Sequence, residues 1–380
     1  MIAAANAVSA LPVGIVADDL TGALDAAAQF ARSGAPVRVL RDADRAAALT
    51  GSWALDAATR NAEAATARHA AVQAGKLLSG AKTAFRKIDS LLRGHVADEI
   101  AATARAGGFA SVVIAPAFPA QGRVARKGRQ YARAPDGSWR AIDVDLAAEL
   151  AERALPPRIA SEAKALRGGG AFLCDAESDA DLAAIAGARI HLSADVLWCG
   201  SAGLARALAG TAARRAAPPG PYLGIVATRE QATLSEIERV RRHAPEAVLE
   251  IRKPDAIVGI AKRASARLSS GKSFLALLRL QPMSNPESAA ALHTLTNEIA
   301  RLRPPALFAS GGDTLAAVID AIEAEWLDVE GEIAPGIPVS RIAGGVWNGI
   351  PVVSKSGAFS AEGVLMQLFN DRADVRHGQT

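Results

Sequence analysis

The strongest constraint on the fold is a repeated succession of a short apolar segment, a polar turn and an alanine-rich helical pattern. In the first instance, the apolar run Val13–Ala17 is followed by the acidic pair Asp18-Asp19 and then by a helical pattern over Leu20–Ser33. Because strands that alternate with helices usually pair in parallel, this pattern predicts a mostly parallel sheet flanked by helices. The further expected strands of the first half are Pro36–Leu40, Thr83–Ile88, Ser111–Ala115, Ala171–Cys174 and Val196–Cys199, and the expected helices are Asp89–Arg105, Asp179–Ala186 and Gly200–Ala209.

A second alternating series follows the strongest break in the sequence, Pro218-Pro219-Gly220-Pro221. We therefore expect two α/β domains, residues 1–217 and 222–380, with ligands at the carboxyl ends of the strands. The expected strands of the second domain are Tyr222–Ala227, Ala247–Ile251, Ser273–Leu280, Ala306–Ser310 and Val352–Ser354, and the expected helices are Glu230–Arg242, Pro254–Ser269, Pro286–Arg303 and Thr314–Trp326.

The composition excludes several classes of protein. Of the 380 residues 50% are hydrophobic and 22% are charged, which is typical of a globular chain. No segment approaches the ~20 apolar residues of a membrane helix. The two cysteines cannot form a disulfide framework, and no basic residue precedes Arg32, so we expect a cytoplasmic protein without a signal peptide. The net charge of +4 is spread along the chain and does not indicate a nucleic-acid partner.

Charged residues gather at two expected turns of the first half. The pair Asp18-Asp19 follows one strand, and the stretch Arg86–Gly94 follows another. If a helix begins at Leu91–Arg93, Arg93 lies one turn above Asp89 and Ser90 and points to the same edge of the sheet. Each turn by itself is typical of helix capping and a solvated surface. Together, in one parallel sheet, they favour a binding site of mixed charge.

Two other stretches leave alternatives open. The five bases Arg123, Arg126, Lys127, Arg129 and Arg133 either attract an anionic substrate or form an exposed loop, and we favour the loop. In the second half, glycines 311 and 312 lie between a strand and a helix. Such a turn either brings backbone amides to a phosphate or is an ordinary turn with Asp313 or Thr314 as the helix cap. The six histidines have no metal-ligand spacing, so the metal ligands stay unknown.

Several motifs in order along the chain resemble the four-carbon acid sugar kinase family. The most specific match is Lys87-Ile88-Asp89-Ser90-Leu91-Leu92-Arg93-Gly94, where the family usually has threonine at position 91. The likeness spans Val13 to Leu368. The other matching segments are Ala17–Ala23 with Asp25, Asp56–Arg60, Pro116–Pro119, Gly122-Arg123, Gly200–Gly203, Gly311–Thr314, Gly336, Pro338 and Ser354–Phe359.

The resemblance implies a sugar-acid-binding N-terminal domain and an ATP-binding C-terminal domain, with the active site in the cleft between them. It also implies transfer of phosphate to the terminal hydroxyl of an acid such as erythronate, threonate or 3-oxo-tetronate. A carboxylate must accept the hydroxyl proton, and an arginine fork suits the carboxylate of the sugar acid. The candidate catalytic residues are Asp18, Asp19 and Asp89, and the candidate substrate-binding residues are Arg60, Lys87, Ser90 and Arg93. The candidate nucleotide-binding residues are Thr228, Gly311, Gly312, Asp313, Thr314, Lys355 and Gly357.

The same resemblance implies Mg²⁺ together with ATP, near an acid such as Asp313, and allows a homodimer. This chain departs from the family pattern in the turn Ala227–Thr233, where a glycine and a proline are missing, in Gly357–Ser360 and in a short loop after Arg133. Two alternatives remain: a kinase of another small hydroxy acid, and a non-catalytic sugar-acid-binding or effector protein. The sequence does not fix the stereochemistry of the substrate.

Overall fold

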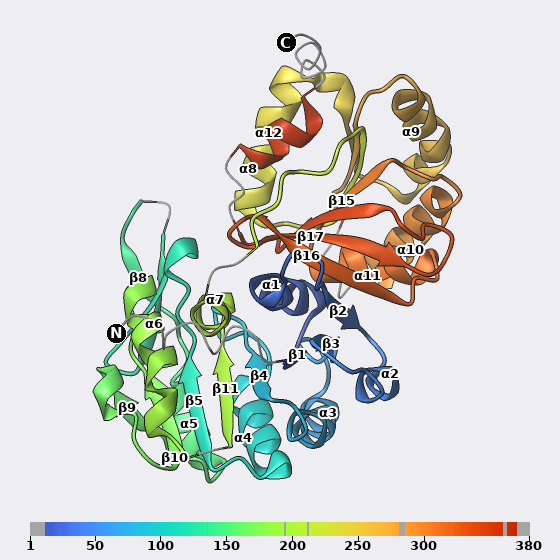
Figure 1. The fold of residues 1–380 in the computed structure, drawn as a ribbon. Coiled ribbons are helices and arrows are strands. Elements are labelled where there is room, and N and C mark those ends of the chain that lie inside the picture. Colours follow the sequence, from blue (N-terminus) through green and yellow to red (C-terminus); the bar gives the residue numbers. More distant parts are fainter. Residues whose placement is uncertain are drawn as a thin grey trace, which may run out of the picture. The chain divides into compact units, whose positions relative to one another are not determined.

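The chain folds into two units that meet in sequence between Ala213 and Arg214. The computed structural model describes residues 12–134, 136–193, 195–210, 213–280, 286–359 and 363–370. In each unit, strands alternate with helices along the chain and pair into a sheet that carries helices around it (Figure 1). This arrangement confirms the predicted α/β class with mostly parallel pairing.

The sheet of the N-terminal unit is parallel throughout its described strands. Ala17 lies beside both Asp56 and Lys87, and Lys87 lies beside Gly200, so these strands end at the same edge. The order across the sheet is β2 (Val37–Leu40), β3 (Trp53–Asp56), β1 (Val13–Ala17), β4 (Thr83–Lys87), β11 (Val196–Gly200), β5 (Ser111–Ala115), β10 (Gly170–Cys174) and β9 (Arg158–Ala160).

Helices of this unit pack in two groups. One group consists of α1 (Leu20–Phe30), α7 (Ala202–Ala209) and α6 (Asp179–Gly187), and the other of α3 (Ala64–Leu78), α4 (Val96–Gly107) and α5 (Leu146–Glu152). A short helix, α2 (Ala43–Ala47), lies beside β2 and β3. In α1 every residue from Leu20 to Gln29 is buried, because its alanines and glycine allow neighbours to approach closely.

Two predictions for this unit were wrong. The helix expected over Asp89–Arg105 begins only at Val96, because Leu92 and Gly94 have φ values of +58° and +84° and turn the chain out of helical geometry. The basic stretch expected as an exposed loop is instead an antiparallel sheet of β6 (Arg123–Arg126), β7 (Arg129–Arg133) and β8 (Trp139–Ala141). Alternation of buried and polar positions is too weak in these short strands to indicate them.

The C-terminal unit has a parallel sheet that continues into an antiparallel edge. The helix predicted over Thr314–Trp326 ends at Ala321, and the chain turns at Glu323, which has φ +56°, into an antiparallel pair of strands that was not predicted. The order is β13 (Val248–Ile251), β14 (Phe274–Leu278), β12 (Tyr222–Val226), β15 (Ala306–Ser310), β18 (Pro351–Lys355), β17 (Ile337–Ala343) and β16 (Trp326–Ala334).

An aromatic core joins the sheet of this unit to two of its helices. Phe369 lies between Tyr222 and Phe308, with ring centroids 6.2 and 5.7 Å away. The helices that contribute to this core are α8 (Gln231–His243) and α12 (Val364–Phe369), while α10 (Pro286–Ala300) packs between α9 (Ile260–Ser269) and α11 (Gly312–Ala321). The helix predicted over Pro254–Ser269 is interrupted at Gly259, which has φ +79°.

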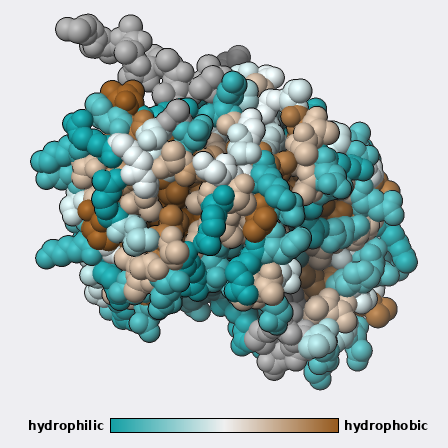
Figure 2. Space-filling model, turned by 90° about the horizontal axis from the view of Figure 1, so that it is seen from below, coloured by the Kyte–Doolittle hydropathy of each residue, from teal (hydrophilic) through white to brown (hydrophobic). Residues whose placement is uncertain are grey.

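Hydrophobic side chains on the surface are scattered. On the face shown in Figure 2 they form small groups separated by hydrophilic residues. Among the described residues, no helix combines the length and apolar character needed to span a bilayer. The large hydrophobic side chains with the greatest exposure are Trp139, Ile159, Ile190, Val258 and Val346, which belong to different elements or connections.

Candidate active site

Acidic side chains meet at the carboxyl edge of the N-terminal sheet. Asp18 and Asp19 follow β1, and Asp89 follows β4, which is the neighbouring strand. Asp19 is the N-cap of α1: one carboxylate oxygen accepts from the Gly22 amide at 2.9 Å and the other from the Thr21 hydroxyl at 2.7 Å. The structure therefore brings together the three acids that were predicted from two separate turns.

Arg60 holds these acids in place. Its Nε and Nη2 donate to the two oxygens of Asp18 at 2.8 Å each, and its Nη1 donates to Asp19 at 2.7 Å. Nη2 also lies 3.8 Å from Asp89. Burial alone would lower the pKa of Arg60, but the negative charges of Asp19, Asp18 and Asp89 raise it above its usual range. Arg60 is thus a fixed cation that three carboxylates share.

The three acids are not equivalent. Asp18 is 2% exposed, and burial raises its pKa in spite of the Arg60 charge. Burial would also raise the pKa of Asp89, but hydrogen bonds from Arg93 and the charges of Arg60 and Arg93 hold it well below its usual range. The Asp19 side chain is 17% exposed, more than either of the others. Asp19 is therefore the acid that solvent, or a substrate, can reach most easily.

The side chain of Arg93 turns back to Asp89, although residues 89–93 do not form a helix. Its Nε and Nη2 donate to Asp89 at 2.7 and 3.0 Å, and its backbone amide donates to the same carboxylate at 3.2 Å. The Arg93 side chain nevertheless remains 42% exposed, against 14% for Arg60. The expected juxtaposition of Arg93 with Asp89 is present, although the turn that produces it differs from the helical one.

The two other predicted residues of this turn are buried. Lys87 is the last residue of β4, packs against Gly22 of α1 and donates to the Ile88 carbonyl at 3.1 Å. The carbonyl of Ser90 accepts from Nε2 of Gln130 at 2.9 Å, and the same amide nitrogen lies 3.3 Å from the Pro116 carbonyl. Gln130 belongs to β7, so the antiparallel sheet is fastened to the edge that carries the acids. This contact was missed because the sequence of β7 gives no signal of it.

Asp56 is a further acid at this edge to which the sequence alone assigned no role. It is the last residue of β3, lies beside Ala17 and accepts from the Ala58 amide at 2.9 Å. Burial raises its pKa to about 6, and the charges of Asp19 and Asp18 act in the same direction. Its position at the end of the apolar run Trp53–Leu55 was the available signal. Asp56 extends the acidic cluster away from Asp89.

The glycine turn of the C-terminal unit has the geometry of an anion-binding turn. Gly311 follows β15 and has φ +103° and ψ 139°, a combination that side chains disfavour, and α11 begins at Gly312. Gly311 donates its own amide to the Lys355 carbonyl at 3.1 Å. Thr314 is buried one turn into the helix, and Asp313 is exposed beside it. The turn therefore ends at the positive dipole end of α11, which is a feature that favours a bound phosphate.

Lys355 and Gly357 lie beside this turn. Lys355 ends β18 next to Ser310, and its ammonium group donates to the hydroxyl of Thr233 and to the Ser356 carbonyl. The Thr233 hydroxyl in turn donates to the Gly357 carbonyl at 2.7 Å. A Cβ at Gly357 would collide with the hydroxyl of Thr228, so a side chain there would displace Thr228. The structure thus brings Thr228, Lys355 and Gly357 together and adds Thr233, while Ser360 lies outside the described residues.

Lys355 makes stability depend on pH in a defined direction. Burial lowers its pKa to about 8, against a partial upward effect of Glu236 and Glu230. Between pH 8 and pH 10 the unfolded chain keeps the proton that the folded chain releases, so the stability of the ligand-free protein rises with pH in this window. We expect it to gain about 2 kcal/mol relative to the Lys355→Met variant from pH 8 to pH 10.

Denaturant unfolding of both proteins across this pH range measures the difference. Because other groups titrate in the same window, the comparison with Lys355→Met isolates the one lysine. Lys164→Met, which removes a lysine whose side chain is 77% exposed, is the control. Parallel pH profiles of the wild type and Lys355→Met would contradict the pKa of Lys355.

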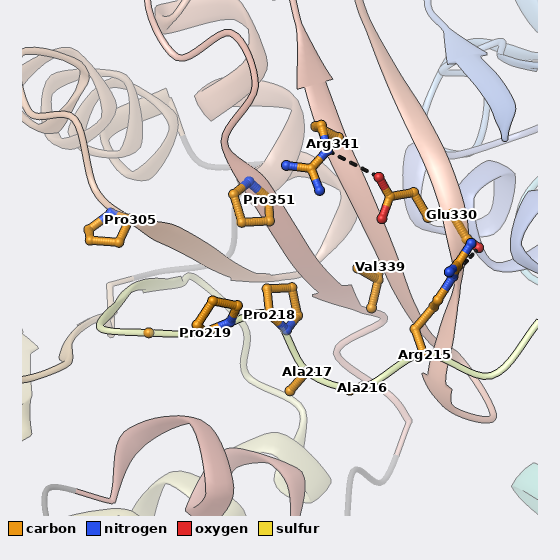
Figure 3. Close-up of a pocket in the computed structure, with 11 residues that line it drawn as sticks. Arg215, Ala216, Ala217, Pro218, Pro219, Pro305, Glu330, Val339, Arg341 and Pro351 are labelled. Carbon is orange, nitrogen blue, oxygen red and sulfur yellow. Dashed lines mark hydrogen bonds and ion pairs between the residues drawn. The ribbon is translucent and has the colours of Figure 1, made fainter. Parts of the chain in front are cut away.

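The described part of the C-terminal unit also has a pocket at the opposite edge of its sheet. The pocket has a volume of about 570 Å³ and lies where β15 and β18 begin, next to Pro305 and Pro351. Figure 3 shows Arg341 on its wall, paired with Glu330 at 3.1 Å. Parallel strands carry their ligands at the carboxyl ends, so this pocket is separate from the glycine turn.

Comparison with known families finds two domain models that match successive regions of the chain. Residues 13–143 and 137–208 match a family model described as a sugar-binding N-terminal domain. Residues 221–365 match one described as a nucleotide-binding C-terminal domain. The acidic cluster lies in the first of these regions, and the glycine turn lies in the second.

Curated relatives match over almost the whole chain. A D-threonate kinase of Cupriavidus necator is 30% identical, with 95% of this chain and 98% of the relative covered. A D-threonate kinase of Bordetella bronchiseptica is 28% identical, covering 93% and 96%. A 3-oxo-tetronate kinase of Methylobacterium radiotolerans is 26% identical, covering 88% and 93%.

Solved structures share the fold. A Salmonella typhimurium LT2 protein superimposes with a TM-score of 0.68 at 18% identity, covering 92% of this chain and 96% of the other. A Haemophilus influenzae protein matched to DUF1537 superimposes with a TM-score of 0.63 at 17% identity, covering 91% of this chain and 97% of the other. The domain models and the relatives agree with the motifs of both units: the chain belongs to the four-carbon acid sugar kinase family.

Proposed function

We propose that this protein is an ATP-dependent kinase that phosphorylates the terminal (4-) hydroxyl of a four-carbon sugar acid, with D-threonate as the first candidate. The observation that carries the proposal is the acidic cluster around Arg60 in the N-terminal unit, which lies beside the exposed guanidinium of Arg93. The C-terminal unit of the same chain carries a glycine turn of the phosphate-binding type. D-Threonate comes first because it is the substrate named for the relatives with 28–30% identity.

Asp19 is the proposed general base. Phosphoryl transfer needs little covalent chemistry from the protein, but the attacking hydroxyl must lose its proton to an acceptor within hydrogen-bond reach. Both oxygens of Asp18 and both of Asp89 accept from arginine side chains, and Asp89 is held as a weak base. Asp19 is more exposed than either. In this scheme the hydroxyl oxygen attacks the γ-phosphorus, the bond to the β-phosphate oxygen breaks, and Asp19 takes the proton.

Arg93 is the proposed partner of the substrate carboxylate. A guanidinium group presents five donors in a planar fork, and Arg93 directs two of its side-chain N–H groups to Asp89. The pairing with Asp89 orients the fork before the substrate arrives, which lowers the entropy cost of binding. Arg60 is more buried and has three N–H contacts to Asp18 and Asp19, so its proposed role is to hold the acids. Lys87 and Ser90 are proposed to shape the same turn.

ATP is proposed to bind at the glycine turn. Gly311 would provide the turn, and the amide of Gly312 at the N-terminus of α11 would face the phosphates, with Thr314 supporting the turn. Thr228, Lys355 and Gly357 would line the neighbouring side. Mg²⁺ normally binds through one or two carboxylates together with phosphates and water, so the exposed Asp313 fits it. The ion would neutralise charge on the phosphates. In the described residues no cluster of three or more metal-binding side chains occurs.

We expect Gly312→Val to weaken ATP binding at least about tenfold while the fold survives. A branched side chain at the first position of α11 would stand where the backbone must approach a phosphate, and one hydrogen bond to a charged group contributes about 1.5–3 kcal/mol. Calorimetric titration with ATP measures the effect. Gly187→Val is the matched control, since Gly187 also lies in a helix and has open space around it. Equal ATP affinity in wild type and Gly312→Val would refute the phosphate site.

A coupled assay of ADP release over a panel of four-carbon acids tests the function as a whole. Turnover with D-threonate, erythronate or 3-oxo-tetronate supports it and identifies the acid. ATP turnover only with another hydroxy acid would establish the first alternative, and binding of an acid without turnover would establish a non-catalytic binder. The proposed location is the cytoplasm, where ATP is available, and a homodimer remains a prediction for light scattering.

A further inference from the structure

Arg86 is a fully buried cation for which the proposed reaction has no use. It lies in β4 next to Lys87, and its Nη2 forms an ion pair with Oε1 of Glu99 at 2.7 Å. Glu99 belongs to α4 and is itself 2% exposed. Among the residues that the structure describes, Nε and Nη1 of Arg86 have no hydrogen-bond partner. A buried guanidinium needs a compensating negative charge, and Glu99 is the acid that pairs with Arg86.

The same oxygen of Glu99 accepts a hydrogen bond from the hydroxyl of Thr59. Thr59 is 1% exposed and directly precedes Arg60. A hydroxyl bond to a charged carboxylate is stronger than a bond between neutral groups, so this contact fixes the backbone beside Arg60.

Two more contacts fix the same loop. The backbone amides of Thr59 and Arg60 both donate to the Asp18 carbonyl, at 3.0 and 3.1 Å. A ring nitrogen of His95, the residue before α4, lies 2.7 Å from the Ala62 carbonyl. The loop is therefore held on both sides of Arg60, while the guanidinium of Arg60 reaches Asp18 and Asp19. Small shifts of the loop would move this cation relative to the acids.

We propose that Thr59, Glu99 and Arg86 form a buried positioning chain that sets Arg60 relative to Asp18 and Asp19, and through Arg60 controls turnover of the sugar acid. None of the three is a catalytic residue. The inference rests on the proposed function for its kinetic consequence. Its structural consequence, which is that residues 57–62 are held in one conformation, does not depend on the proposed function.

The kinetic test uses Thr59→Val, which removes the hydroxyl and keeps the shape. Misplacement of a charged group at a reacting centre is costly, so we expect kcat with the sugar acid to fall about tenfold or more while KM for ATP is unchanged. Thr59→Ser restores the hydroxyl and should recover most of the loss. The matched control is Thr103→Val, because Thr103 is a buried threonine of the same helix as Glu99 and its hydroxyl donates to Ala71 of α3 instead.

Hydrogen exchange gives a readout that needs no substrate. Since the amides of Thr59 and Arg60 are hydrogen-bonded to Asp18, the peptide covering residues 57–62 should exchange faster in Thr59→Val than in wild type, Thr59→Ser or Thr103→Val. If wild type turns over no sugar acid, the proposed function fails and this measurement alone decides the positioning chain. Unchanged exchange in Thr59→Val, or equal kinetic losses in Thr59→Val and Thr103→Val, would overturn it.

Discussion

Asp19→Asn should lower kcat with the sugar acid by about 10²–10⁴-fold, the range that general-base catalysis supplies. The amide of asparagine cannot accept the hydroxyl proton at neutral pH. Asparagine is nevertheless as good an N-cap as aspartate, so α1 keeps its first-turn hydrogen bond and the protein should fold. ATP binding should be unaffected, because Asp19 lies in the sugar-binding part of the chain. Steady-state kinetics and ATP titration of the purified variant measure both effects.

The matched control for this variant is Asp42→Asn. Asp42 is also an N-cap, for α2, and like Asp19 it has an arginine nearby, with Arg45 at 3.7 Å. Its side chain is 54% exposed, and the helix that it caps follows β2 rather than β1. A collapse of kcat in Asp19→Asn but not in Asp42→Asn assigns the loss to chemistry rather than to capping. If Asp19→Asn keeps near-normal kcat and Asp18→Asn or Asp89→Asn loses it, the base is one of those acids.

Much of the fold could be predicted because strong local patterns agree with the tertiary structure. β1, β5 and β15 are mostly apolar and are buried along their length, and such runs followed by turns identify parallel strands. The antiparallel edge was missed for the opposite reason. β16 alternates buried and half-buried residues, which is a weaker signal, and neither glycine nor proline separates it from the end of α11.

The candidate site shows the same division. The three acids and Arg93 of the two turns could be predicted because the carboxyl ends of neighbouring parallel strands meet at one edge, whereas Arg60 was indicated only by the family resemblance. The sequence could not show that Arg60 is directed to Asp18 and Asp19 while Arg93 pairs with Asp89, since side-chain pairing depends on turns with left-handed residues such as Leu92. Contacts from distant elements, such as Gln130 to Ser90, have no local signature at all.

The pairing of the two arginines bears on how a kinase of this family would select acids over neutral sugars. A neutral sugar offers hydroxyl groups, whereas a sugar acid adds a planar carboxylate that matches a guanidinium fork. Of the two candidates, Arg60 is largely enclosed by carboxylates and Arg93 is nearly half exposed. Selectivity for acids should therefore depend on Arg93, with Asp89 as the residue that orients it.

We expect Arg93→Ala to lose ~3 kcal/mol in transition-state stabilisation, about a hundredfold in kcat/KM for the sugar acid. Arg93→Lys keeps the charge but not the fork, so its kcat/KM should lie between those of Arg93→Ala and wild type. Arg140→Ala is the control, because Arg140 has the same spacing to its partner Asp136 as Arg93 has to Asp89 but lies on the exposed strand β8. If Arg93 only stabilises the fold through Asp89, both Arg93 variants will melt at lower temperature with kinetics nearly intact. That result would transfer the role of carboxylate partner to Arg60, whose bonds to Asp18 and Asp19 would then have to rearrange when the substrate binds.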